Sequence, residues 1–162
     1  MTATPAPTLR PARESDVAAI AAVLDRTFPV AYAGVLPPAA LAACRAADRL
    51  RRLAATGWPH MWVAESGAAV VGFVQVLDAR IANLWVAPAA QGTGVGRRLL
   101  DLAETAIRRA GHGQARLEVF DGNDRALEFY RSRGWSAVGR GTFDLEGHPI
   151  PETVMVKDLG AD

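Results

Sequence analysis

Residues 84–100 combine the features of an anion-binding turn. The stretch begins with β-forming residues that Pro88 stops, and it ends in apolar residues at the three-to-four spacing of a helix. Between the two, Gln91–Gly96 carries glycines at alternate positions. Glycine permits positive φ and a close backbone approach, and the first N–H groups of a helix have no acceptor within it. Such a turn directs N–H groups and the positive end of the helix dipole at one point, which suits phosphate or pyrophosphate.

The spacing of these glycines separates the known phosphate-binding turns. A Walker loop needs GxxxxGK[ST], and the chain contains neither Gly-Lys-Ser nor Gly-Lys-Thr. A dinucleotide fingerprint needs GxGxxG, whereas here the third glycine comes one residue early, as GxGxG. These differences disfavour a nucleotide-binding domain. The plain alternative is a strand-to-helix turn that holds no ligand.

The elements that must position this turn follow from the periodicity of the rest of the chain. We expect a first strand at 8–10, a helix capped by Ser15 and ended by Pro29, and a second helix from Pro37 to about Ala55. Strand-like stretches lie at 61–65, 70–77, 81–86, 115–120, 135–140 and 154–157, and further helices at 95–111 and 124–133. The three strands from 61 to 86 predict an antiparallel meander. The order βααβββαβαββ predicts a mixed α/β fold, with a central mixed sheet flanked by helices.

Composition limits the classes of protein to consider. The chain has 162 residues, half of them hydrophobic, which predicts one domain at 8–162 after a flexible N-terminus at 1–7. A net charge of +1 gives no support for nucleic-acid or membrane binding. No stretch resembles a membrane span or a signal peptide, so a cytoplasmic protein is expected. The single cysteine, Cys44, is expected to be a buried apolar residue, and the three histidines show no metal-binding spacing.

Two motifs in the right order resemble the GNAT N-acetyltransferase superfamily. The first is Q-x-x-G-x-G at Gln91–Gly96, after a strand and a proline, which is similar to the acetyl-CoA signature of that family. The second is the block from Asn123 to Tyr130, followed by Gly134-Trp135, which resembles N-x-x-A-x-x-x-Y…G-[FW]. The element order also looks like GNAT from about residue 9 to residue 159. The resemblance implies a GNAT-like fold and an acetyl-CoA cosubstrate, with no metal.

The resemblance also implies which residues contact the cosubstrate. In GNAT enzymes the strand before the glycine turn splays from its neighbour, and the gap holds pantetheine and the acetyl group. By position, main-chain groups of Leu84, Trp85 and Val86 would contact these groups, and the turn would hold the pyrophosphate. The turn residues are Gln91, Gly92, Thr93, Gly94, Val95, Gly96 and Arg97. Asn123 would also face pantetheine, or would serve only as a helix cap. Arg97 and Arg98 would pair with phosphate or lie exposed on the helix.

Tyr130 and Glu118 are the candidate catalytic residues. Acyl transfer from a thioester expels a thiolate, and a neutral phenol such as that of Tyr130 can donate a proton to it. Glu118 alternates with apolar Leu117 and Val119, so it lies on the opposite strand face and could take a proton from an ammonium. The structural alternatives are a tyrosine packed on the sheet and a glutamate paired with Arg116 or Arg140.

The function predicted on these grounds is acetyl transfer to a primary amine by direct attack on the thioester. The alternatives are another acyl-CoA or acceptor, and a CoA-binding regulatory module without turnover. The acceptor is expected to be a small-molecule or peptide amine, and the sequence leaves a homodimer open. Asp144, Glu146 and Glu152 fall in an expected polar loop, which predicts either an acidic entrance for a cationic amine or an exposed loop without a ligand.

Overall fold

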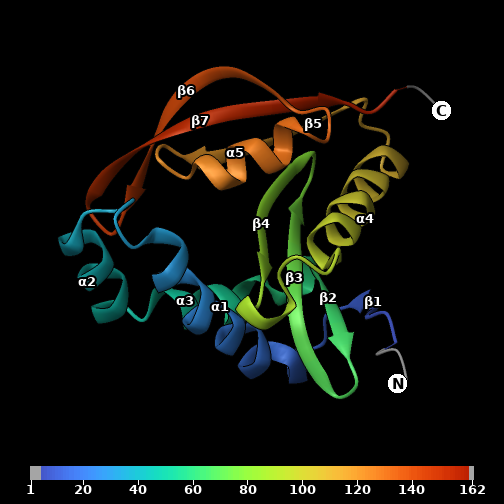
Figure 1. Ribbon diagram of the computed structural model, residues 1–162, viewed down its shortest axis with the longest axis horizontal. Coiled ribbons are helices and arrows are strands. Elements are labelled where there is room, and N and C mark those ends of the chain that lie inside the picture. Colours follow the sequence, from blue (N-terminus) through green and yellow to red (C-terminus); the bar gives the residue numbers. More distant parts are fainter. Residues whose placement is uncertain (1–4, 161–162) are drawn as a thin grey trace.

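The computed structural model describes residues 5–160, which form seven strands and five α-helices (Figure 1). The strands are β1 (Thr8–Pro11), β2 (Met61–Ser66), β3 (Ala69–Leu77), β4 (Arg80–Val86), β5 (Gln114–Phe120), β6 (Ser136–Leu145) and β7 (His148–Asp158). The helices are α1 (Val17–Tyr32), α2 (Pro38–Ala46), α3 (Arg49–Gly57), α4 (Val95–Arg109) and α5 (Asp124–Arg131). The predicted mixed α/β fold is confirmed, with one helix more than expected before β2.

All seven strands form one mixed sheet in the order β1-β2-β3-β4-β5-β7-β6. The predicted meander β2-β3-β4 is antiparallel throughout. The parallel step, β4 to β5, is joined at a single residue pair, Arg80 with Arg116. Beyond that pair the two strands diverge, and Figure 1 shows β4 leaving the half of the sheet made by β5, β7 and β6. The sheet is therefore divided into two halves that meet at one end.

Alternation along the central strands creates two hydrophobic cores, one on each face of the sheet. Ala64 and Val74 face the core under α4, whereas their neighbours Val63 and Phe73 face the core under α1 and α3. The α4 side is completed by buried Leu99, Leu100, Ala103 and Ile107 of that helix. The two packed layers fix the meander firmly on both sides.

A third core joins the second half of the sheet to α1 and α2. It contains Phe28, Leu36 and Ala40 from the helical side and Leu145 and Ile150 from the β6–β7 hairpin. Cys44 is buried in this core, as expected.

The prediction of a polar loop between the last two strands is wrong. Residues 141–149 continue β6 and β7 in register, and the chain reverses at Glu146 and Gly147. Both residues have positive φ, 49° and 85°, as a tight two-residue hairpin turn requires. Alternating apolar residues such as Phe143 and Leu145 support the strands, because their side chains enter the third core. The polar residues of this segment had indicated a loop, so the strand-like alternation of its apolar residues was overlooked.

The first two predicted helices also need correction. Pro29 lies inside α1 and does not end it, because proline there removes only one hydrogen bond and Ala33 N still donates to the Pro29 carbonyl. The second helix is broken into α2 and α3 at Asp48, which has a φ of 52°. The chain between Arg13 and α1 forms a short 3₁₀ turn that includes Ser15, so Ser15 is not the cap of α1.

Two further predictions concern the N-terminus and membrane-spanning segments. Residues 1–4 of the expected flexible N-terminus lie outside the described range, and residues 5–7 precede β1 without regular structure. Within residues 5–160 there is no helix with the length and apolar character needed to cross a bilayer.

Asp16 ties the entry of α1 to the edge strand β1. Its carboxylate accepts hydrogen bonds from Arg10 Nη1 at 2.7 Å, from Arg10 Nη2 at 2.9 Å and from the main-chain N–H of Arg13 at 2.7 Å. The Arg10 bonds, above all, hold the pKa of Asp16 below its usual value. Because Asp16 is buried, these charge-assisted bonds are weakly screened by solvent.

We expect Asp16→Asn to lower the free energy of unfolding by about 2 kcal/mol at neutral pH, since hydrogen bonds to a buried charge are lost. A folded-state pKa below the unfolded value means that the carboxylate's contribution is complete above about pH 4 and disappears as the pH falls through the folded-state pKa. Urea unfolding of the wild type and the variant at several pH values measures this. Asp25→Asn, at an exposed position of α1, is the control. A difference that persists unchanged in acid would contradict the assignment.

Candidate active site

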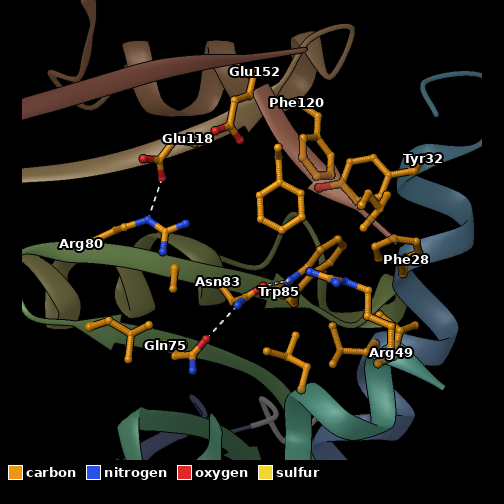
Figure 2. Close-up of a pocket in the computed structure, with 17 residues that line it drawn as sticks. Phe28, Tyr32, Arg49, Gln75, Arg80, Asn83, Trp85, Glu118, Phe120 and Glu152 are labelled. Carbon is orange, nitrogen blue, oxygen red and sulfur yellow. Dashed lines mark hydrogen bonds and ion pairs between the residues drawn. The ribbon is translucent and has the colours of Figure 1, made fainter. Parts of the chain in front are cut away.

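A cavity of about 310 Å³ lies where α1 and α3 face the diverging strands β4 and β5 (Figure 2). Five aromatic residues line it: Phe28, Tyr32, Trp85, Phe120 and Phe143. Four charged residues line it as well: Arg49, Arg80, Glu118 and Glu152. The cavity is therefore apolar along its wall and carries charges of both signs, an arrangement typical of small-molecule sites.

The aromatic residues bridge the gap between the two halves of the sheet. The Tyr32 ring of α1 lies 5.6 Å from the Trp85 ring of β4 and 5.3 Å from the Phe120 ring of β5, measured between centroids. Phe120 in turn contacts Phe143 of β6 at 5.8 Å. Ring packing thus replaces the hydrogen-bonded ladder that β4 and β5 lack beyond Arg80, and it leaves a hollow instead of a closed sheet.

A polar chain fixes Trp85 in the cavity wall. The Trp85 indole N–H donates to Asn83 Oδ1 at 3.2 Å, and Asn83 Nδ2 donates to Oε1 of buried Gln75 at 2.8 Å. Gly57 makes room for this chain, because a Cβ there would come within 2.7 Å of Gln75 Nε2. The tryptophan is held by bonds on one side and ring contacts on the other, so its orientation is defined.

The glycine turn has the geometry expected from its sequence. Gly92 and Gly94 have φ of 77° and 89°, and α4 begins at Val95 with no side chain capping it. The first helical hydrogen bond is donated by Arg98 to the Gly94 carbonyl. Within residues 5–160, the main-chain N–H groups from Gly92 to Arg97 find no acceptor. They form a concave set of donors at the positive end of a helix, which favours an anion.

Side chains of the turn have roles that the sequence did not indicate. Gln91 Nε2 donates to the Val86 carbonyl at 3.1 Å, which ties the turn to the end of β4. The Gln91 N–H donates to Pro88, so the donors begin at Gly92. Arg97 and Arg98 are both exposed, and Arg98 donates to the Pro7 carbonyl.

The chain has two tyrosines, Tyr32 at the end of α1 and Tyr130 on α5. Tyr130 of α5 is buried in the α4-side core, between Phe129 and Trp135. Burial, and to a smaller extent the nearby Tyr32, raises the pKa of Tyr130. Tyr32 faces the cavity and is hydrogen-bonded to the side chain of Asn123; burial raises the pKa of Tyr32 to about 12. Both phenols therefore stay protonated at neutral pH.

Asn123 serves as a cap and also contacts the site. Its Oδ1 accepts a hydrogen bond from Ala126 N at 3.3 Å, which begins α5. Its side chain also bonds to Tyr32, so one residue joins α5 to the cavity wall.

Glu118 and Glu152 are the two carboxylates of the cavity, and their surroundings differ. Glu118 Oε2 accepts from Arg80 Nε and Oε1 accepts from Arg116 Nε, both at 2.8 Å. Burial alone would raise the pKa of Glu118, but the two arginines hold it below its usual value. Glu152 has no hydrogen bond or ion pair to any residue in the described part of the chain. Burial, and then the charge of Glu118, raises the pKa of Glu152.

The predicted acidic entrance does not form. Glu146 Oε1 accepts from Arg49 Nη1 at 3.1 Å and from Arg52 Nη2 at 2.8 Å, so its charge is balanced twice. Arg49 also lies over the Phe143 ring and lines the cavity. Asp144 is exposed and lies outside the cavity lining. The cavity is therefore close to neutral.

Residues 57–137, half of the chain, match the family described as Acetyltransferase (GNAT) domain. The chain belongs to the GNAT acetyltransferase family. An N-acetyltransferase of Mycobacterium tuberculosis, itself described as uncharacterized, is 29% identical over 161 residues and is matched over 90% of this chain and 99% of its own length. The peptidyl-lysine N-acetyltransferase YiaC of Escherichia coli is 32% identical over 78 residues, which cover 48% of this chain and 50% of that protein. The relatives are named N-acetyltransferases, and this GNAT protein is an acyltransferase.

Solved structures give the same family. A GCN5-related N-acetyltransferase from Rhodopseudomonas palustris superposes with a TM-score of 0.84 at 25% identity and covers 98% of this chain and 99% of its own. The PaiA N-acetyltransferase of Thermoplasma acidophilum, solved in complex with coenzyme A, has a TM-score of 0.76 at 17% identity, with 95% of this chain and 99% of that chain covered. At that identity the second likeness shows the GNAT fold alone.

Within this GNAT fold, the residues singled out from the sequence fall into two groups around the gap. Leu84, Trp85 and Val86 form the end of β4, and the glycine turn follows them directly. Glu118 lines the cavity, whereas Tyr130 lies on the α4 side. Within residues 5–160, no group of three or more His, Cys, Asp or Glu residues is placed to hold a metal ion.

Sequence reasoning did not place Tyr32, Arg49 or Arg80 at the site, whereas Glu152 was among the residues predicted for an acidic entrance. Tyr32 follows Phe28 by four residues, so its place on the apolar face of α1 was readable. The two arginines were not readable, because their positions depend on the packing of α3 against the sheet and on the single β4–β5 junction.

We expect neither tyrosine of the folded protein to produce tyrosinate as the pH passes about 10, the value for an exposed phenol. Burial raises both pKa values, that of Tyr32 to about 12. Tyrosinate absorbance against pH measures this, with circular dichroism reporting the fold. The control is the same titration in urea, where both phenols should ionise near 10. Half of the final absorbance appearing near pH 10 with the fold intact would show one phenol exposed.

Proposed function

We propose that the protein transfers the acetyl group of acetyl-CoA to a primary amine by direct attack of the amine on the thioester. The observation that carries the proposal is the row of N–H groups at Gly92–Arg97, which lack acceptors and follow the end of β4 that has no β5 partner. These donors fit a pyrophosphate. A Cβ built at Gly92 or Gly94 would meet nothing within 4 Å, so the turn is open to a ligand.

The end of β4 is proposed to receive the pantetheine arm and the thioester. The edge of Leu84, Trp85 and Val86 that faces β5 has no strand partner, so its main-chain groups are available to amides of a ligand. A main-chain N–H near Val86 would stabilise the oxyanion formed on attack. The amine would enter from the opposite side, through the cavity that Figure 2 shows.

Tyr130 is proposed to assist departure of the thiolate. Its phenol is protonated at every working pH because burial raises the pKa. A buried donor of this kind acts in a medium where a hydrogen bond to a developing charge is strong.

Two carboxylates line the cavity, Glu118 and Glu152, and one of them is proposed to take the proton of the incoming ammonium. Glu118 is the base that the sequence predicts. Its ion pairs with two arginines argue against that role, because they stabilise the ionised carboxylate. The acceptor is proposed to be a small molecule or the amine of a peptide side chain or terminus. The peptidyl-lysine and N-alpha-acetyltransferase names of two relatives support a primary amine. The reaction is placed in the cytoplasm, the compartment that the sequence favours.

The proposed function is tested by the release of free thiol from acetyl-CoA in the presence of monoamines, polyamines and lysine peptides. We expect amine-dependent release, with the acetylated amine identified by mass spectrometry. Saturable acetyl-CoA binding without turnover of any amine would support a regulatory module instead. Turnover with a longer acyl-CoA but not with acetyl-CoA would support the alternative donor.

We expect Gly94→Ala to weaken acetyl-CoA binding by at least tenfold. A left-handed φ costs alanine roughly 1–2 kcal/mol, and relief of that strain would turn the N–H groups away from the pyrophosphate. Calorimetry on the folded variant measures the affinity. Gly67→Ala in the β2–β3 turn is the matched control, because Gly67 also has positive φ and an open surrounding. Equal acetyl-CoA affinity for both variants and the wild type would exclude the turn.

We expect Tyr130→Phe to lower kcat by about 10²-fold or more while acetyl-CoA affinity changes little, since only the hydroxyl is lost and general acids contribute about 10²–10⁴. Single-turnover kinetics isolates the chemical step. Full kcat in the variant, with chemistry limiting the rate, would leave Tyr130 as a packing residue.

A further inference from the structure

The register of β5 and β7 places three side chains on the cavity face of the sheet. Phe120 pairs directly with Glu152, and Glu118 lies two residues earlier on β5, hence on the same face. Figure 2 shows Glu152 between Glu118 and Phe120. The alternate residues Leu117 and Val119 enter the opposite core. Glu152 is therefore a cavity residue by strand geometry and not by the chance position of a flexible side chain.

The surroundings of Glu152 provide space but no direct ion pair within the described residues, because the nearby Arg80 and Arg116 are both bonded to Glu118. Its partner on β6 is Gly141, where a Cβ would lie 3.4 Å from Glu152 Oε1, so the missing side chain leaves room for the carboxylate. No described residue donates a hydrogen bond to either oxygen. A half-buried carboxylate without a donor is costly, and a ligand that brings an N–H or a positive charge removes that cost.

Glu118 cannot fill the same role without losing its partners. Each of its oxygens already accepts from an arginine, and together Arg80 and Arg116 bring two positive charges to one carboxylate. A third cation is repelled by these arginines. Glu152 carries the one cavity charge without an ion pair in the described residues.

We propose that Glu152 binds the ammonium of the acceptor and takes its proton, and that the acceptor is a primary amine with this single positive charge on an apolar or aromatic body. The inference rests on the proposed function. The aromatic wall of Trp85, Phe120 and Phe143 would hold the body. Arg49 and Arg80 would repel a second ammonium, which disfavours polyamines.

The proton and electron movements are balanced in this scheme. The ammonium gives one proton to the Glu152 carboxylate and becomes a neutral amine. Its lone pair forms the C–N bond to the acetyl carbonyl carbon, and the C–S bond breaks with its electrons on sulfur. The thiolate takes a proton from Tyr130, and the amide nitrogen returns one to the phenolate. Glu152 then releases its proton to water.

The kinetic test uses phenethylamine as acceptor and compares Glu152→Gln with the wild type at saturating acetyl-CoA. We expect kcat/KM near pH 7 to fall by about 10²-fold or more, because glutamine cannot take the proton. The defect should shrink as the pH approaches about 10, where alkylamines lose their own proton. Acetyl-CoA affinity should be unchanged. Asp144→Asn, which removes an exposed charge from the same hairpin, is the matched control and should behave as the wild type.

The pH profile of the wild type adds a second readout. Activity should fall as the pH falls through the pKa of Glu152, which burial and the charge of Glu118 raise. Charged groups around Glu152 come from β5, the turn after it and β4, namely Glu118, Arg116, Asp121 and Arg80. Glu118→Gln removes the largest of these charge effects, so it should move this acidic limb to lower pH. A purely structural glutamate would give a loss of activity that is the same at all pH values.

Three outcomes would overturn the assignment. One is wild-type kcat/KM in Glu152→Gln together with a large loss in Glu118→Gln, which would make Glu118 the base. The second is a higher kcat/KM for spermidine than for phenethylamine. The third concerns a wild type that acetylates no amine, which would be a failure of the proposed function itself. In that case calorimetry measures the binding of phenethylamine to the protein with coenzyme A present. No binding, or equal binding by the wild type and Glu152→Gln, would exclude the Glu152 site.

Discussion

The separation of β4 from β5 is the constraint on which the site depends. One residue pair, Arg80 with Arg116, joins the two strands, and beyond it each backbone edge lacks its neighbour. An open ladder inside a sheet is unfavourable because buried N–H and carbonyl groups need partners. The structure maintains it because packed cores cover both faces of the sheet: the α4-side core extends under both halves, the core under α1 and α3 covers the meander, and the third core covers the β6–β7 hairpin. The gap is thus enforced by packing on both sides.

Aromatic and ionic contacts hold the two halves at a fixed separation. Tyr32 contacts Trp85 on one side and Phe120 on the other, and it bonds to Asn123 at the start of α5. Glu118 of β5 is paired with Arg80 of β4, so an ion pair continues the junction where the ladder stops. Rings provide contact area without satisfying backbone groups, which leaves the strand edges available. The same contacts that keep the halves together therefore keep the edges of β4 and β5 open.

Charges in the cavity are organised by pairing. Glu118 and Glu146 each accept from two arginines, and this leaves Glu152 as the cavity carboxylate without a partner in the described chain. Paired and unpaired glutamates therefore differ in pKa, because a neighbouring arginine favours the ionised carboxylate while burial disfavours it. Selectivity for an acceptor would then depend on where its charge lies and not on its total charge.

Local patterns in the sequence determined the mixed α/β fold, the meander, the glycine turn and the cap at Asn123. Each depends on near neighbours: alternation places Val63 and Phe73 on one face, and the glycines at 92 and 94 adopt the positive φ that their turn needs. The sequence did not reveal the break at Asp48, the continuation of α1 through Pro29 or the long β6–β7 hairpin. In these places tertiary contacts outweighed local preference, as when Phe143 and Leu145 entered a core. The pair of Glu118 with Arg116 was an alternative that the sequence offered, since the two lie on one face of one strand. The tertiary structure alone decided the second partner, because Arg80 and Glu118 are 38 residues apart and meet only through the single β4–β5 junction.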